Sequence, residues 1–174
     1  MTQAEENRQS DPNEHDRRAT AYHEAGHAVM ALALGRPLEK VTIAPGKIPY
    51  GPATLGMCKI QKGRFKPSKD ELEDDMLILL AGMAAESQVT GRYCKQGAAY
   101  DLNAVAGLAA SRAGSEDQIR RVVKRALNKA ENILEDEECK LALESIAAEL
   151  LSRETISGRS ARHLYEEAVR RASR

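Results

Sequence analysis

Two histidines and a glutamate at helical spacing are the residues of this sequence best suited to chemistry. His23, Glu24 and His27 lie in the run AYHEAGHA. Residues four apart on an α-helix share one face, with Cβ atoms about 5–6 Å apart, so two imidazoles can bind one Zn²⁺. Glu24 follows the first histidine and can take the proton of an attacking water as a general base. This H-E-x-x-H pattern therefore indicates a zinc metallopeptidase.

The surroundings of the motif decide how much weight it carries, because five-residue matches also occur by chance. The chain has only 4 histidines, and two of them stand at ligand spacing around a glutamate. Alanine, valine, methionine and leucine flank the motif, and unpaired imidazoles are costly to bury among such residues. A metal site is therefore favoured over two surface or core histidines.

A peptidase zinc site also needs a third protein ligand and one open position. A histidine six residues after His27 would make the metzincin pattern, but that position is Ala33. His163 belongs to a distant amphipathic segment, where a surface or packing role is favoured. Asp101 and Glu86 remain, and their spacing alone does not choose between them. Each also has a plain structural interpretation, Asp101 as an acid at a helix N-terminus and Glu86 as a helix-surface carboxylate.

The elements that must position these residues are expected to be mainly α, with a small β-sheet next to the HExxH helix. That helix should begin near Arg18 or Thr20 and end before Gly35 and Pro37. Two strands should follow, one around Val41 and one over residues 54–60. The remainder reads as helices, with an apolar stripe on the first and serine N-caps on two later ones. The stripe comprises Leu72, Met76, Leu79, Leu80 and Met83, and the caps are Ser115 and Ser157.

Composition limits the other function classes. The 26 basic and 26 acidic residues balance, and aromatic residues make up 3%, so a nucleic-acid partner is not expected. No apolar run is long enough for a membrane segment, and the N-terminus is no signal peptide, so a cytoplasmic protein is expected. Residues 1–16 are polar and predict a disordered tail before a single domain over 17–174.

The sequence resembles the peptidase domain of the FtsH family, the membrane-bound ATP-dependent zinc proteases of peptidase family M41. The likeness runs from about Ala21 to about Arg171 through AYHEAGHA, KVTIAP, LGM, LLAGMAAE, GAAYDL, AENILED and LLSRETISG. It implies a helical zincin-like domain with Asp101 as the third zinc ligand. Glu86 would then orient a ligand histidine, and the substrate would be an unfolded polypeptide.

Departures from the family pattern shape the expected activity. The chain has no G-x-x-x-x-G-K-[ST] phosphate loop and begins with Met1, so ATP-independent peptide hydrolysis by a single chain is expected. A homo-oligomer and a separate ATPase or adaptor are the candidate partners. Ala98, Ala99 and Tyr100 replace the residues more usual in the family before the acid. The insertion GKIPYGPAT predicts an altered rim of the active site.

The second expected strand offers a way to bind substrate. If residues 54–60 form an edge strand, Leu55, Gly56 and Met57 could add a substrate strand by backbone hydrogen bonds. A structural hairpin that merely covers the helix is an equal alternative. For the whole chain, the alternatives to a zinc endopeptidase are a catalytically silent zinc-binding scaffold or regulatory module and a helical interaction module without metal.

Overall fold

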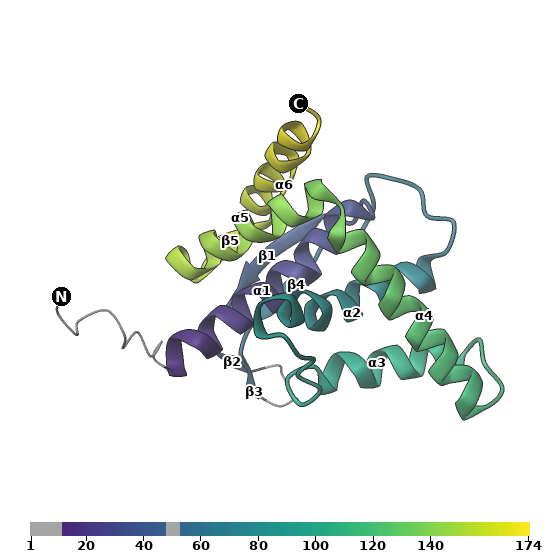
Figure 1. The fold of residues 1–174 in the computed structure, drawn as a ribbon. Coiled ribbons are helices and arrows are strands. Elements are labelled where there is room, and N and C mark those ends of the chain that lie inside the picture. The colour runs from purple at the N-terminus through teal and green to yellow at the C-terminus, as the bar shows by residue number, and fades with distance from the viewer. Residues whose placement is uncertain (1–11, 48–52) are drawn as a thin grey trace, which may run out of the picture.

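The structure is a computed structural model that describes residues 12–47 and 53–174. Figure 1 shows a helical domain with a small sheet against one side of it. The elements follow in the order α1 (Pro12–Ala33), β1 (Leu38–Thr42), β2 (Gly46–Lys47), β3 (Ala53–Thr54), β4 (Met57–Ile60), α2 (Glu71–Thr90), α3 (Ala99–Ala110), α4 (Glu116–Glu135), α5 (Glu137–Arg153), β5 (Thr155–Ser157) and α6 (Gly158–Ala172). The expected mainly α class with a small sheet is confirmed.

The sheet has the strand order β4-β1-β5, and both of its pairings are antiparallel. Val41 in the central strand lies opposite Cys58 of β4 and Ile156 of β5. The expected pair of strands is therefore confirmed as β1 and β4. The third strand was not expected, because β5 has only three residues between two helices and shows no readable alternation.

The expected strand over residues 54–60 is divided in two. β3 pairs with β2 as a separate short hairpin, whereas β4 joins the main sheet. The division falls at Leu55 and Gly56, where the chain passes the side chain of Glu24. Residues 48–52, which include most of the expected rim insertion, lie outside the described residues.

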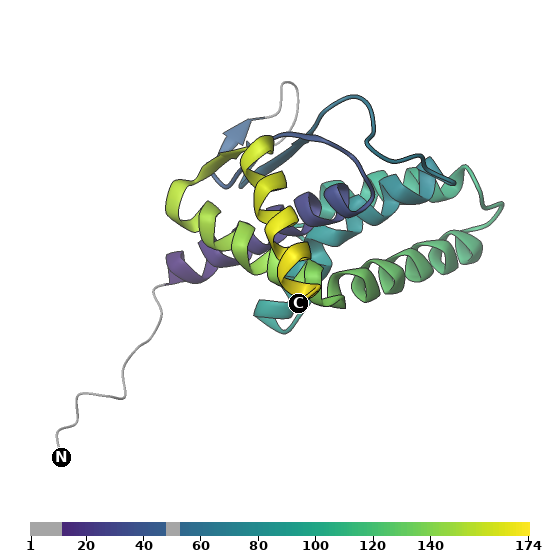
Figure 2. The same ribbon diagram turned by 90° about the horizontal axis from the view of Figure 1, so that it is seen from above.

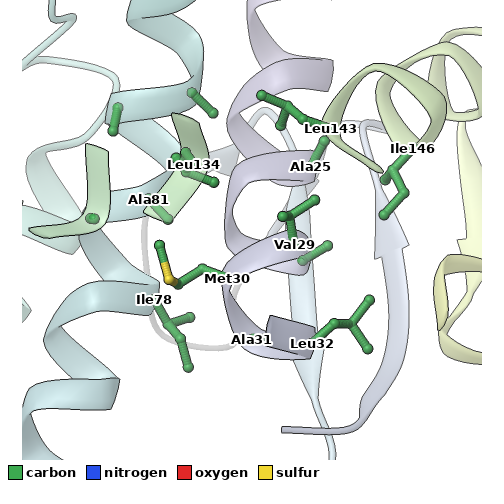
Figure 3. Packing of buried hydrophobic residues seen from close by; sticks show 14 of the residues in the cluster. Ala25, Val29, Met30, Ala31, Leu32, Ile78, Ala81, Leu134, Leu143 and Ile146 are labelled. Carbon is green, nitrogen blue, oxygen red and sulfur yellow. The ribbon is translucent and has the colours of Figure 1, made fainter. Parts of the chain in front are cut away.

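Helix α1 forms the centre of the domain, between α2 on one side and α5 on the other. Figure 3 shows Met30 directed toward Ile78 of α2, while Val29 points toward the side that carries Leu143 and Ile146 of α5. Small residues let the neighbours come close, and four alanines of α1 are buried completely. They are Ala21, Ala25, Ala28 and Ala31.

Helix α1 begins at Pro12, earlier than the expected start near Arg18 or Thr20. Proline favours the first helical position because its φ is already helical and its missing N–H has no partner there. Arg17 also holds this end in place, since its guanidinium lies 3.3 Å from the Leu151 carbonyl and 3.3 Å from the Glu154 carboxylate. Residues 1–11 of the expected tail lie outside the described residues.

Helix α2 packs against both α1 and α4, so burial extends around it rather than along one stripe. Residues 76–86 are buried except for Leu79, which is half-buried. Asp70 caps the N-terminus by accepting a hydrogen bond from the Glu73 N–H at 3.0 Å. Gly91 ends the helix with φ 72, the left-handed conformation that glycine adopts easily. Of the expected stripe, Met76, Leu80 and Met83 are confirmed in the core, and Leu72 and Leu79 pack against it partly buried.

The later helices begin where the sequence indicates. Ser115 accepts a hydrogen bond from the Gln118 N–H at the start of α4, and Ser157 accepts one from the Ser160 N–H at the start of α6. Figure 2 shows α4 running beside α2 and α3 on the side away from the sheet. None of the helices in the described ranges is both long and apolar enough to cross a lipid bilayer.

The first turn of α6 rests directly on β1, and we predict that its glycine is required for this contact. A Cβ atom at Gly158 would overlap the Leu38 carbonyl and lie 3.1 Å from the Glu39 nitrogen. Gly158→Ala should therefore lower the free energy of unfolding by roughly 1–3 kcal/mol, measured by urea denaturation.

Gly107→Ala is the matched control, because no atom lies within 4 Å of a Cβ there. It should raise the free energy of unfolding by up to about 1 kcal/mol, since alanine is the better helix former. Wild-type stability in Gly158→Ala would contradict this account of the contact between α6 and β1.

Candidate metal centre

Three potential metal ligands from two helices meet in one small volume. His23 and His27 come from α1, and Asp101 comes from the first turn of α3. The Asp101 Oδ2 atom lies 3.3 Å from the Nε2 atom of each histidine. One ligand atom from each residue lies within 4.8 Å of the other two. The structure thus brings together the three residues that the sequence and the resemblance named.

The opposite nitrogen of each imidazole is held by a hydrogen-bond acceptor. The His23 Nδ1–H donates to Glu86 Oε2 at 2.9 Å, and the His27 Nδ1–H donates to the Ile78 carbonyl at 2.7 Å. With the proton on Nδ1 in a neutral ring, the Nε2 lone pair is free to coordinate a metal. Both free nitrogens face Asp101. Glu86 thus contacts His23 from the side away from the three-residue cluster.

Negative charge dominates this buried site. Burial lowers the pKa of His23, but hydrogen bonds to Asp101 and Glu86 and the charge of Glu24 outweigh it and raise the pKa to about 10. Burial would raise the pKa of Asp101, but its contacts with His23 and His27 hold it well below the usual range. Burial raises the pKa of Glu24, and the two histidines oppose that rise. The surroundings therefore favour positive charge at the His23 imidazole.

The donor set fits a divalent zinc ion. Two Nε2 lone pairs and a carboxylate oxygen would repel one another unless a proton or a cation lay between them. Two imidazoles and one carboxylate are a common ligand set for catalytic zinc, which keeps a fourth position open. With Glu24 adjacent but outside the cluster, the arrangement can support hydrolysis assisted by a metal ion.

Two glycines make this geometry sterically feasible. At Gly26, between the histidines, a Cβ would lie 2.6 Å from the Ala85 Cβ, so glycine lets α1 approach α2. At Gly82 of α2, a Cβ would overlap His27 Nε2 and lie 2.7 Å from His23 Nε2. The space between the two imidazoles is therefore open only because residue 82 has no side chain.

The expected substrate strand lies beside the general-base candidate. A Cβ at Gly56 would lie 2.7 Å from both Cγ and Oε1 of Glu24. Leu55 is 69% exposed, and Met57 begins β4, where it pairs with Thr42 of β1. The structure thus places Gly56 against Glu24, next to the end of β4 that begins at Met57.

Asp101 depends on the segment between α2 and α3 for its position. The Tyr93 hydroxyl donates to Glu131 of α4, and the Ala98 N–H donates to the Cys94 carbonyl at 3.1 Å. Tyr100, next to the acid, is 62% exposed.

The surface role favoured for His163 is confirmed, whereas three groups around the site were missed. His163 is exposed on α6 and lies 3.8 Å from Glu167, apart from the cluster. Sequence reasoning missed the Ile78 carbonyl, because a backbone acceptor leaves no mark in residue types. It also missed Gly26 and Gly82, although a glycine inside a helical pattern often signals close packing or function.

Comparison with known proteins is consistent with this site. The model of peptidase family M41 matches residues 11–115, more than half of the chain. The chain therefore belongs to peptidase family M41. All three members of the cluster lie within the matched segment.

The relatives are all much longer than this chain. It is 38% identical over 108 residues to the ATP-dependent zinc metalloprotease FtsH of Protochlamydia amoebophila, covering 61% of this chain and 11% of that protein. It is 40% identical over 99 residues to the enzyme of the same name from Magnetococcus marinus, covering 56% and 14%. A longer match, 27% identical over 197 residues, joins it to FtsH 3 of Petrotoga mobilis and covers 88% and 30%. The chain thus spans less than a third of each of these relatives.

We predict that the absence of a side chain at position 82 is a requirement for metal binding. Gly82→Ala should retain its helix content, because alanine favours a helix, but it should weaken Zn²⁺ binding by roughly 10- to 100-fold, the scale of defects around metal ligands. Competition with a chromogenic chelator measures the affinity, and circular dichroism measures the fold. Gly107→Ala is again the control, and equal zinc affinity in both variants would contradict the prediction.

Proposed function

We propose that this chain is a zinc-dependent endopeptidase that hydrolyses peptide bonds of flexible or unfolded polypeptides. The observation that carries the proposal is the convergence of two imidazole nitrogens and one carboxylate oxygen within 4.8 Å. Membership of a peptidase family and the presence of Glu24 beside the cluster support the same activity.

In this proposal His23, His27 and Asp101 hold the zinc ion. Glu86 and the Ile78 carbonyl fix the two imidazoles, because each accepts the Nδ1–H of one ring. Such partners set the orientation of a ligand and increase its basicity. The alternative third ligand, Glu86, is less favourable because it is already engaged with the Nδ1 face of His23.

A bound zinc ion would supply a Lewis acid that polarises the scissile carbonyl and lowers the pKa of the attacking water. Glu24 accepts the proton of that water and then returns it to the nitrogen of the leaving amine. Burial raises the pKa of the Glu24 carboxyl, which brings it closer to the range useful for a general base at neutral pH. Electrostatic attraction to His27 and His23 opposes this rise.

Substrate binding is proposed along β4. Among the strands of the described residues, β4 pairs only with β1, so its second edge is available for a further strand. Backbone hydrogen bonds along Leu55, Gly56 and Met57 would hold an extended peptide next to Glu24 with little demand on its sequence. A segment already paired inside a folded protein cannot join β4 in this way, which is why flexible polypeptides are the proposed substrates.

The sequence of 174 residues contains no phosphate-binding loop, so we expect its peptide hydrolysis to proceed without ATP. The relatives are named as ATP-dependent enzymes. A separate ATPase or adaptor would therefore extend the activity of this chain to folded substrates, and self-association is compatible with it.

We predict that Glu24→Gln abolishes proteolysis and leaves the metal in place. The amide cannot accept the proton, so kcat for an unfolded substrate such as casein should fall by at least about 100-fold. Zinc content, measured by elemental analysis, should stay at one ion per chain, because Glu24 is not a proposed ligand.

A zinc chelator should abolish the wild-type activity, and added Zn²⁺ should restore it. Omitting ATP should have no effect. A wild-type chain that contains zinc but cleaves no unfolded substrate would support the catalytically silent scaffold instead. Both the endopeptidase and the zinc-binding scaffold would be excluded if the wild-type chain contained no zinc. They would also be excluded if His23→Ala removed none of the bound metal.

We predict that Glu86 acts through His23 and not as a ligand. Glu86→Gln retains the shape of the side chain but removes its charge, so zinc affinity should fall by about 10- to 100-fold. Asp101→Asn should lower the zinc affinity further than Glu86→Gln does, because it removes the charge of a proposed ligand. Glu144→Gln, at an exposed position of α5, is the control for loss of a carboxylate. Equal defects in Glu86→Gln and Asp101→Asn would contradict the division of roles.

A further inference from the structure

A cavity of about 530 Å³ opens at the end of the sheet that lies farther from the metal centre. The register fixes its place, because Met57 pairs with Thr42 at the end near Glu24 and Ile60 pairs with Leu38 at the other end. The cavity is bounded by residues from the end of α1, the start of β1, the segment after β4 and the start of α6. They include Leu32, Leu38, Gln61, Phe65, Arg159 and Arg162.

The cavity combines an apolar base with positive charge at its rim. Leu32 and Leu38 are buried, whereas Phe65 is 56% exposed. The Arg162 guanidinium lies over the Phe65 ring, 4.5 Å from its centre, and pairs with Glu166 at 2.7 Å. Arg159 is exposed, and in the part of the chain that the structure describes no carboxylate lies within ion-pair distance of it.

The start of α6 adds to this positive charge. Arg159 is the second residue of α6, a helix of 15 residues whose N-terminus opens onto the cavity. A helix N-terminus carries partial positive charge and favours anions nearby. The acidic member of the lining, Glu39, is paired with Lys59 at 2.9 Å. Because Glu39 and Arg162 are already paired, the positive charge available to a ligand comes from Arg159 and the N-terminus of α6.

Strand β4 leads from the metal centre to this cavity. Gly56 lies against Glu24, and Gln61, five residues further along, lines the cavity. Five residues of strand span about 16 Å at ~3.3 Å per residue. Every pairing in this sheet is antiparallel. A substrate strand added antiparallel to β4 would reach the cavity with the residues that precede its scissile bond.

We propose that the cavity is a remote subsite that binds an acidic side chain of the substrate, about four to six residues on the N-terminal side of the bond cleaved. Arg159 is the residue that determines this preference. This inference rests on the proposed function, because it assumes that a polypeptide substrate lies along β4. The aliphatic stem of a glutamate would lie on Leu38 and Phe65, while its carboxylate meets the guanidinium of Arg159.

The test measures binding apart from cleavage. The zinc-loaded chain carrying Glu24→Gln is titrated against fluorescent flexible peptides in which one glutamate moves stepwise through an uncharged sequence. The tightest peptide should bind roughly 3- to 10-fold better than its lysine counterpart, the scale of an exposed ion pair aided by a helix terminus. The difference should shrink at high salt, because exposed charges are screened.

Charge reversal at the rim supplies the decisive comparison. Arg159→Glu should reverse the preference from glutamate to lysine, and it should fold normally because an acid suits the first turn of a helix. Arg170→Glu makes the same charge change at an exposed site in the last turn of α6, away from the cavity lining, and should leave the preference intact. In the wild-type chain, mass spectrometry of the products should show the cleaved bond moving in step with the glutamate.

Several outcomes would overturn the subsite. They are the absence of peptide binding, a glutamate preference unaffected by Arg159→Glu, a stronger preference for leucine than for glutamate, and cleavage that does not follow the glutamate. If peptides bind with the preference expected of Arg159 but the wild-type chain cleaves none of them, the proposed peptidase activity fails and the acidic subsite stands.

Discussion

The close approach of α1 to α2 is the constraint on which the rest of the site depends. At Gly26 the two helices come so near that a Cβ would lie 2.6 Å from that of Ala85. Because of this proximity, the Ile78 carbonyl and the Glu86 carboxylate both reach the Nδ1 atoms of imidazoles on the neighbouring helix. Each ring is thus fixed from α2, and both Nε2 atoms face Asp101. A wider spacing would leave the histidines free to turn.

That constraint also explains how so many ionisable groups remain buried together. Glu24, Glu86 and Asp101 would repel one another in a site of low dielectric constant unless positive charge compensated them. His23 supplies part of this charge, because its contacts with Asp101, Glu86 and Glu24 raise its pKa to about 10 despite burial. A divalent cation held by the three ligand atoms would complete the compensation. The same charges that make the apo site costly therefore favour metal binding.

The sequence predicted the local features of the fold, because the HEAGH spacing, the apolar helices and the caps at Ser115 and Ser157 depend on residues near one another. It did not decide between Asp101 and Glu86 by spacing, since 78 residues separate Asp101 from His23 and only the packing of three helices sets their distance. Resemblance to a family supplied that choice. Strand β5 was missed for a related reason, because its three residues become a strand only by pairing with β1.

The sheet joins the segment that the family model matches to a segment that lies beyond that match. The match to the family model ends at residue 115, after α2, α3 and the cluster of His23, His27 and Asp101. Strand β5 and α6 follow that limit, yet β5 pairs with β1 and the first turn of α6 rests on Leu38. The cluster and the edge strand therefore come from the matched segment, whereas Arg159 at the far end of the same sheet does not. In our proposal, chemistry and substrate preference can change independently, because a substitution at the start of α6 alters the charge beside the proposed substrate path without touching a proposed ligand.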